Sequence, residues 1–284
     1  MPKISIITVS YNSGKTIADT LESVAKQTFK DVEHIIVDGA SKDDTLDIVR
    51  SFNHIAKVRS EPDRGIYDAM NKGLEMASGE IIGFLNSDDM YAHEGVLEQI
   101  AKTFEFKNVD TVYSDLHFFK NSTDNIVRVW KAGATNRQRF LGGWMPPHPT
   151  FFAKKSVYDR FGVFDAAFKQ SGDYELMLRF LYKHGVSTHY MQGVSILMRA
   201  GGQTGATVKN RVRANKEDAF AWDKNGLKRY WYTLYLKPML KIEQLRFFYR
   251  KWRAVRQRFF EKPFQQNAAQ NSVEDAVQTQ NVTK

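Results

Sequence analysis

The chain has 284 residues, a formal net charge of +9 and no cysteine. This length can form one large α/β domain, or one domain with an appendage, and 42% apolar residues are typical of a globular protein. Without cysteine there is no disulfide, thiolate nucleophile or zinc–thiolate site, which fits a reducing compartment. The apolar run at residues 4–9 is shorter than that of a signal peptide, and no run approaches a transmembrane helix, so we expect neither.

The positive charge is concentrated near the C-terminus. Residues 224–262 contain twelve Lys and Arg but only two Glu, a net charge of +10, so the rest of the chain is close to −1. A pI near 9.5 suggests a nucleic-acid-binding protein. The positive charge is confined to the C-terminal segment, however, and the rest of the chain is nearly neutral, which argues against this function.

Strand and helix patterns alternate from the first residues onward. Strands are predicted at residues 4–9, 34–38, near 57–60 and at 81–85, with helices at 17–27, around 46–49 and at 66–77. This alternation is typical of right-handed βαβ units, and it predicts a Rossmann-like α/β fold with a mostly parallel sheet flanked by helices.

The second half of the chain has a more mixed pattern. We expect a helix at 96–104, a strand at 111–115, a hairpin at 116–131 that turns at 121–125, a strand at 151–153 and a helix from residue 156. A further helix at 174–181, opened by Asp173, precedes strands at 187–190 and 194–199.

Polar side chains follow several of the predicted strands. In open α/β sheets, ligands bind outside the carboxyl ends of the strands, so we expect Thr8, Tyr11, Asp38 and Asp88 to line one edge. Asp88 and its neighbour Asp89 follow the strand at 81–85 directly. The alternative is that these two acids only cap the helix that begins near residue 94.

Adjacent carboxylates without a His or Cys cluster suit Mg²⁺ or Mn²⁺. Such an ion keeps several waters and is completed by substrate phosphates, so a phosphorylated ligand is expected. The chain has no G-x-x-x-x-G-K-[ST] loop and no G-x-G-x-x-G after the first strand, which argues against a P-loop NTPase and against NAD.

Four motifs follow one another along the chain. They are Thr8-Val9-Ser10-Tyr11-Asn12, Val37-Asp38-Gly39-Ala40-Ser41-Lys42-Asp43, Glu61-Pro62-Asp63-Arg64-Gly65-Ile66-Tyr67-Asp68-Ala69-Met70-Asn71-Lys72-Gly73 and Leu85-Asn86-Ser87-Asp88-Asp89. Together they resemble the signatures of family 2 glycosyltransferases of the GT-A fold, above all bacterial O-antigen and exopolysaccharide enzymes. The resemblance covers about residues 3–205.

This resemblance implies an inverting sugar transfer from a nucleotide-diphosphate donor, most often a UDP-sugar, with Mn²⁺ or Mg²⁺. It implies donor binding at Thr8, Tyr11, Asn12, Asp38, Arg64, Asn71, Asn86 and Asp88, and metal binding at Asp88 and Asp89. Asn86 stands where many members of the family have an Asp, so the main metal ligand among the two acids stays open.

An inverting transfer also needs a base for the proton of the acceptor hydroxyl. Asp173 matches the family's acidic catalytic position, although Gly172 stands where Glu is frequent. The competing role for Asp173 is an N-cap of its helix. By position, Arg199 and the glycines after it could contact the diphosphate, and His148 could contact the acceptor or have a structural role.

The C-terminal part predicts an extension to the catalytic domain. We expect a GT-A domain at residues 1–222, a basic, aromatic amphipathic helical segment at 223–262 and a disordered tail at 263–284. The basic segment suits an anionic membrane surface, or alternatively packs on the catalytic body. A membrane would place the protein on the cytoplasmic face of the bacterial inner membrane, where a polyprenyl-diphosphate-linked saccharide is the expected acceptor.

The sequence therefore favours a glycosyltransferase of O-antigen, capsule or exopolysaccharide synthesis. The alternatives are a metal-dependent nucleotidyltransferase, for which the loop at 10–15 is poor in glycine, and a non-enzymatic nucleic-acid-binding protein.

Overall fold

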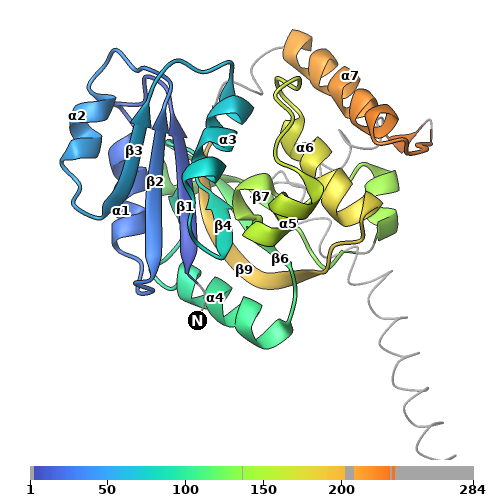
Figure 1. Ribbon diagram of the computed structural model, residues 1–284, viewed down its shortest axis with the longest axis horizontal. Coiled ribbons are helices and arrows are strands. Elements are labelled where there is room, and N and C mark those ends of the chain that lie inside the picture. Colours follow the sequence, from blue (N-terminus) through green and yellow to red (C-terminus); the bar gives the residue numbers. More distant parts are fainter. Residues whose placement is uncertain (1–2, 136, 202–207, 231, 234–284) are drawn as a thin grey trace, which may run out of the picture.

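A curled central sheet lies between two layers of helices (Figure 1). The computed structural model describes residues 3–135, 137–201, 208–230 and 232–233. The predicted tail and most of the predicted basic segment, namely residues 231 and 234–262, fall outside these residues. The predicted domain boundary at residue 222 lies inside the helix α7 (Val208–Lys224).

The first half of the sheet is parallel, as predicted. Its strand order is β3-β2-β1-β4, formed by β1 (Ile4–Ser10), β2 (Val32–Asp38), β3 (Ile55–Ser60) and β4 (Ile81–Phe84). Every residue of β1 and β4 is buried, because helices cover both faces of a parallel sheet. Ser10 pairs with Asp38 and Asp38 with Ser60, so these three strands end at the same level.

The second half of the sheet is mixed. It contains β5 (Met90–Tyr91), β6 (Thr111–Lys120), β7 (Ser122–Trp130), β8 (Phe152–Lys154) and β9 (Thr188–Arg199). β8 pairs antiparallel with both β4 and β6. β7 pairs antiparallel with β6, and β5 pairs antiparallel with β9. β9 runs parallel to β6.

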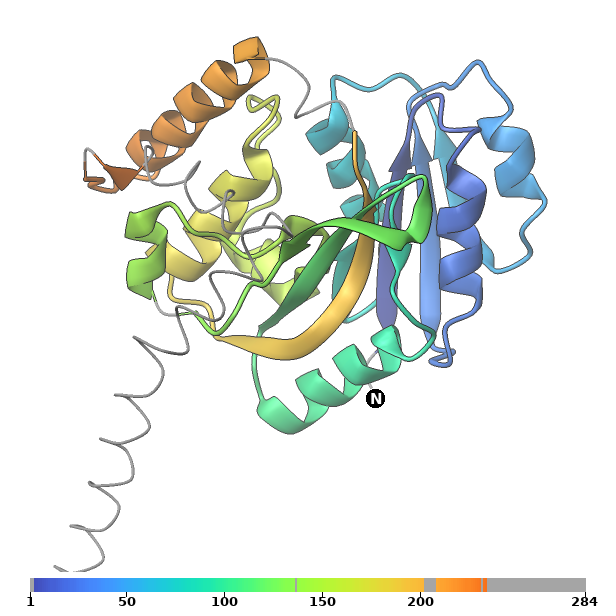
Figure 2. The same cartoon turned by 180° about the vertical axis from the view of Figure 1, so that it is seen from behind.

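Two details of this half differ from the sequence prediction. β6 continues to Lys120 before the hairpin turns at Asn121, which has a left-handed φ of 66°. The two strands expected at 187–190 and 194–199 are one long strand, because β9 pairs with β6 along both stretches. The residues between the two stretches are accommodated by shifts in the pairing register near Asp115. Figure 2 shows the strong curvature of β9.

Each face of the sheet has its own set of helices. α1 (Ile17–Ala25), α2 (Thr45–Arg50) and α4 (Val96–Lys107) cover one face, and α3 (Ile66–Met76), α5 (Lys155–Phe161) and α6 (Gly172–Met177) cover the other. Each fully buried Leu or Ile, such as Leu21 or Ile36, contributes roughly 1.5–3 kcal/mol. α6 continues into a π-helical segment (Leu178–Lys183).

The remaining short elements are two 3₁₀ helices, Arg137–Gly142 and His148–Thr150. None of the helices described here combines the length and apolar character needed to cross a bilayer.

Candidate active site

Asp38 ties together the strand ends at the edge of the sheet. It is fully buried, and its carboxylate accepts hydrogen bonds from Ser10 Oγ (3.1 Å), Ser60 Oγ (2.8 Å), Ser41 N (2.9 Å) and the Ser41 hydroxyl. These partners come from β1, from β3 and from the loop after β2. Asp38 therefore lies at the predicted edge, where it fixes the backbone around it.

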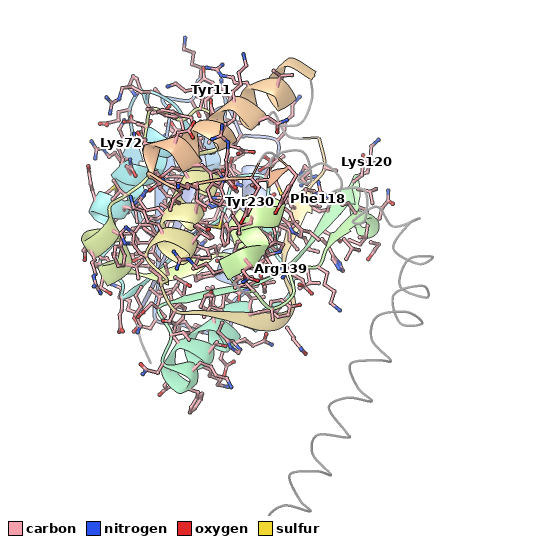
Figure 3. The ribbon with its side chains drawn as sticks, turned by 90° about the vertical axis from the view of Figure 1, so that its right-hand side faces the viewer. Tyr11, Lys72, Phe118, Lys120, Arg139 and Tyr230 are labelled. Atoms are coloured by element: carbon pink, nitrogen blue, oxygen red, sulfur yellow. The ribbon has the colours of Figure 1, made fainter. Side chains whose placement is uncertain are left out.

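Tyr11 is the exposed aromatic side chain at this edge (Figure 3). It is 60% exposed and lies beside Gly39, where a Cβ atom would come within 3.3 Å of the ring and 2.5 Å of Asp63 Oδ2. An aromatic face next to a carboxylate can stack on a planar base and accept a hydrogen bond from it. Asp63 belongs to the third motif, but its position beside Tyr11 was not predicted from the sequence.

Asn12 shapes the loop that carries Tyr11. Its φ is 50°, its N–H donates to Ser41 Oγ (2.8 Å), and its Oδ1 accepts from Lys42 N (2.9 Å). The first two motifs are thus joined by hydrogen bonds, as their shared position at the strand ends predicts.

Asp89 is enclosed by protein donors. It is fully buried, with Oδ1 accepting from Arg199 N (3.2 Å) and Oδ2 accepting from Asn86 Nδ2 (3.0 Å), while its carbonyl accepts from Thr20 Oγ1 (2.8 Å). Burial, followed by the negative charge of Asp88, raises the pKa of Asp89 to about 8.

Asp88 has a different environment. It is half-buried, and in the described part of the chain no other residue donates a hydrogen bond to its carboxylate. Burial raises its pKa, and the charge of Arg199 opposes this rise. The alternative that these acids cap α4 is wrong, because α4 begins at Val96 after Gly95 without a side-chain cap.

Arg199 lies at the end of β9, opposite the two acids. Besides its backbone contact with Asp89, its Nη2 donates to Asp19 Oδ2 (2.8 Å) and its guanidinium lies 4.9 Å from the centre of the Phe119 ring. Its Nε is buried and has no hydrogen-bond partner among the described residues. Arg199 therefore brings a cation to the acidic pair, and no described residue accepts a hydrogen bond from its Nε.

Asp173 faces α3 through its carboxylate. Its Oδ1 accepts from the Tyr67 hydroxyl (3.2 Å), across 106 positions of sequence. Ser171 occupies the N-cap of α6 and no side chain makes a cap hydrogen bond, so the alternative that Asp173 is the N-cap is wrong. A Cβ at Gly172 would lie 2.8 Å from the Tyr67 ring, which explains why a small residue stands there.

A chain of aromatic contacts places Asp173 near the end of β4. The Tyr67 ring stacks on Phe164 (5.6 Å between centres), and Phe164 meets Phe84 edge-on (5.2 Å). Phe84 is the last residue of β4, and Asp88 follows four positions later. Asp173 is therefore linked through two aromatic rings to the strand that the predicted carboxylate Asp88 follows.

His148 lies in the same aromatic group. Its ring contacts Phe84 (6.1 Å) and Phe164 (6.0 Å), and its Nε2 is buried without a partner among the described residues. Burial lowers its pKa, and the charge of Asp173 opposes this shift. His148 is therefore a neutral imidazole close to Asp173.

Three other predicted donor residues have their side chains bonded within the protein. Thr8 is fully buried and its hydroxyl contacts His34 Nε2 (3.0 Å). Asn71 makes two hydrogen bonds with the backbone of Phe164 (2.8 and 3.0 Å). The Arg64 side chain is 80% exposed and pairs with Asp68 (2.6 Å). The structure thus assigns Thr8 and Asn71 internal contacts and leaves Arg64 at the surface.

The carboxylate oxygens of Asp88 and Asp89 are ligands that suit a hard divalent cation bound by few protein side chains. Within the described ranges, no group of three or more His, Cys, Asp or Glu side chains could hold a metal. Mg²⁺ and Mn²⁺ sites often use one or two carboxylates, with water and substrate phosphates completing the coordination. Asp88, whose carboxylate accepts no hydrogen bond from another described residue, fits such a site.

Comparison with known proteins gives consistent matches. A family model described as "Glycosyl transferase family 2" matches residues 5–176. A PGL/p-HBAD biosynthesis glycosyltransferase of Mycobacterium tuberculosis is 30% identical over 198 residues, which are 68% of this chain and 75% of the relative. An uncharacterized glycosyltransferase of the same species is 33% identical over 184 residues, which are 63% of this chain and 68% of the relative.

Solved structures share the fold. TarS of S. aureus in complex with UDP-GlcNAc has a TM-score of 0.62 at 20% identity, covering 80% of this chain and 68% of that one. The mannosyltransferase PcManGT of Pyrobaculum calidifontis, in complex with GDP-Man and Mn²⁺, has a TM-score of 0.60 at 17% identity, covering 84% and 70%. The α/β sheet with its flanking helices is therefore of the GT-A type, as predicted.

Proposed function

Because the chain belongs to glycosyl transferase family 2 and is a glycosyltransferase, we propose that it transfers a sugar, with inversion, from a nucleotide-diphosphate donor to a saccharide hydroxyl. The observation that carries this proposal is the row of ring contacts from Phe84, at the end of β4, through Phe164 to Tyr67, whose hydroxyl donates to Asp173. Family membership removes the support for a nucleotidyltransferase or a nucleic-acid binder.

The donor is proposed to be a UDP-sugar whose base lies against Tyr11. The exposed ring, the bare backbone of Gly39 and the Asp63 carboxylate supply stacking and a hydrogen-bond acceptor. The solved structures of similar fold contain UDP-GlcNAc in one case and GDP-Man in another, so the class of donor is supported more strongly than its base.

Asp88 is proposed to be the main metal ligand. Asp89 already accepts hydrogen bonds from Asn86 and Arg199, so its role is to fix the turn. A bound Mn²⁺ or Mg²⁺ would supply Lewis-acid stabilisation of the diphosphate leaving group. The Arg199 guanidinium, which is partly exposed, would donate to the same phosphates.

Asp173 is proposed to accept the proton of the acceptor. As the acceptor oxygen forms its bond to the anomeric carbon, the bond from that carbon to the diphosphate breaks and the nucleoside diphosphate leaves. The hydroxyl proton passes to the Asp173 carboxylate. The Tyr67 hydroxyl orients this carboxylate, and neutral His148 can bind a second hydroxyl of the acceptor through Nε2.

The test is the variant Asp173→Asn with Mn²⁺ and a panel of sugar nucleotides. Turnover should fall by roughly 10²–10⁴-fold, because a general base contributes about that much. Donor and Mn²⁺ affinity, measured by calorimetry, should stay within about twofold, because Asp173 is not placed at the donor phosphates. The exposed Asp223, on α7, gives the control variant Asp223→Asn. Unchanged turnover in Asp173→Asn would remove this residue from the mechanism.

The acceptor is proposed to be a lipid-linked saccharide of O-antigen, capsule or exopolysaccharide synthesis. The protein would then act in the cytoplasm, peripherally at the inner face of the bacterial cytoplasmic membrane. Lys228, Arg229 and Tyr230 are exposed after α7, and Tyr230 is labelled in Figure 3. The Tyr230 ring stacks on that of Tyr232, with ring centres 5.1 Å apart. A basic and aromatic surface of this kind suits anionic headgroups.

Removal of residues 237–262 tests the membrane proposal. The shortened protein should lose its binding to anionic liposomes, because most of the predicted positive charge lies there. Removal of residues 264–284, which carry little charge, is the control. Binding that persists without residues 237–262 would contradict the proposal.

A further inference from the structure

Three consecutive backbone amides converge on one carboxylate oxygen. Lys169 N (3.1 Å), Gln170 N (2.8 Å) and Ser171 N (3.0 Å) all donate to Oε2 of Glu217. Glu217 lies on α7, and its side chain is only 15% exposed. A largely buried carboxylate that accepts three N–H groups holds its partners with charge-assisted hydrogen bonds, which are stronger than neutral ones.

These amides lie immediately before the helix that carries Asp173. Ser171 is the N-cap of α6, yet no side chain makes a cap hydrogen bond to that helix. The Ser171 hydroxyl instead donates to the Ala214 carbonyl on α7 (3.3 Å). The start of α6 is therefore held by another helix, and Glu217 supplies most of that attachment.

Contacts on both sides of the three amides strengthen the attachment. Before the three amides, buried Phe168 packs against Phe220 with ring centres 5.3 Å apart. After them, Trp222 Nε1 donates to the Tyr174 hydroxyl (2.8 Å). α7 thus binds the chain two residues before Asp173 and one residue after it. Figure 1 shows α7 beside α6, on the side away from β1–β3.

The same loop also reaches the third motif. Lys169 Nζ donates to the Arg64 carbonyl (2.9 Å), three residues before Tyr67, whose hydroxyl contacts Asp173. The position of Asp173 therefore depends on two attachments, the Tyr67 hydroxyl at its carboxylate and the Glu217 carboxylate at the backbone before it.

We propose that Glu217 is a positioning residue for Asp173, an inference that rests on the proposed role of Asp173 as the base. Without this carboxylate, three amides at the start of α6 lose their acceptor and the loop has to find another conformation. A displacement of about 1 Å at a reacting group can lower the rate roughly a hundredfold. Glu217 does not touch the Tyr11 or Asp88 side of the site, so donor binding does not depend on it.

The experiment compares Glu217→Ala, Glu217→Gln and the control Asp223→Asn in the full chain with Mn²⁺ and the active sugar nucleotide. Glu217→Ala should lower kcat by roughly tenfold to a hundredfold, with the donor KM within about twofold of the wild-type value. Glu217→Gln should recover a large part of kcat, because its amide oxygen can accept the same N–H groups. Asp223→Asn should match the wild type.

Hydrogen exchange gives a second measurement that does not depend on activity. Amides of residues 169–171 should exchange faster in Glu217→Ala than in wild type or Asp223→Asn, while peptides from β1 and β4 should be unchanged. The inference is overturned if exchange at 169–171 is unchanged, or if it rises while kcat does not fall. It is also overturned if Glu217→Ala raises the donor KM at constant kcat, or if Glu217→Gln is as slow as Glu217→Ala.

Asp173→Asn, measured in the same series, separates the two proposals. If Asp173→Asn keeps full turnover, or if the wild type uses no sugar nucleotide, the proposed function fails. If Asp173→Asn is inactive and Glu217→Ala is not impaired, only the role of Glu217 fails.

Discussion

At the residue scale, the two neighbouring acids after β4 have different surroundings. Asp89 is enclosed, and both of its carboxylate oxygens accept hydrogen bonds from Asn86 or Arg199. Asp88 is half-buried, and its carboxylate accepts none from any other described residue. Asn86 thus supports Asp89 through a hydrogen bond, and this geometry favours the proposal that Asp88 is the main metal ligand.

The variant Asp88→Asn should lose metal dependence. We expect turnover to fall by about a hundredfold or more, since an ion worth several kcal/mol to the leaving group would no longer be held. In a thermal melt, Mn²⁺ should stabilise the wild type but not the variant. In EDTA the variant should be at least as stable as the wild type, because the charge that raises the pKa of Asp89 has gone.

The exposed Glu94, before α4, provides the matched control Glu94→Gln. It removes one carboxylate close in sequence to the acidic pair, so it should keep both turnover and the Mn²⁺ effect. A normal Mn²⁺ shift in Asp88→Asn would show that another residue is the main ligand.

At the scale of single elements, the start of α6 depends on a close approach to α3. The Tyr67 ring occupies the space that a side chain at Gly172 would need, and its hydroxyl reaches Asp173. The family's frequent Glu would not fit here without moving Tyr67. This departure from the family pattern is therefore matched by a bulky residue on the neighbouring helix.

The variant Gly172→Ala should be destabilised by about 1–3 kcal/mol, the usual cost of overpacking a filled interior. Turnover should fall as well, because displacement of Tyr67 moves the partner of Asp173. Urea unfolding and steady-state kinetics measure the two effects. Gly142→Ala is the control, since a Cβ there would have no atom within 4 Å. Equal stability of the two variants would contradict the proposed contact.

The elements of the parallel half could be predicted because local patterns determine them. Buried runs such as β1 and β4 mark strands, and polar residues after them mark their carboxyl ends, so Tyr11, Asp38 and Asp88 were correctly expected at one edge. The outward or inward direction of each side chain was not predictable in this way. Thr8 fits the donor motif, yet it points to His34 inside the protein.

The contacts that complete the site join residues far apart in the chain. The Tyr67 hydroxyl donates a hydrogen bond to Asp173, 106 positions away in the sequence, and the Arg199 N–H donates one to Asp89, 110 positions away. No local spacing encodes such pairs, because they arise only when β9 and α6 pack against the first half. The continuity of β9 was missed for the same reason, since its pairing with β6 overrides the break in its own pattern.

At the scale of the whole molecule, stability depends on a buried imidazole in the central sheet. His34 is completely buried, contacting Thr8 Oγ1 (3.0 Å) through Nε2 and His54 Nε2 (3.0 Å) through Nδ1. Burial, followed by the charge of His54, lowers the pKa of His34 to about 3. The folded protein therefore keeps this ring neutral at a pH where the unfolded chain protonates it.

Stability should accordingly fall with pH through this group. Below the ordinary histidine pKa of 6.5, His34 binds a proton in the unfolded state but not in the folded state. The free energy of unfolding therefore falls by about 1.4 kcal/mol for each pH unit, down to about pH 3. The variant His34→Gln lacks this proton. In urea unfolding, the free energy of unfolding of the variant should be lower than that of the wild type at pH 7, and this difference should be smaller at pH 5. A difference that stays constant with pH would contradict the lowered pKa of His34.

The four hydrogen bonds on Asp38 have a consequence for the kinetics of donor binding. They hold the ends of β1 and β3 and the loop after β2 together before any ligand arrives. A binding surface that is already ordered loses little conformational entropy on association, and its encounter rate is not limited by a preceding rearrangement. Association of the nucleotide alone should therefore follow a single exponential, with an observed rate that rises linearly with nucleotide concentration.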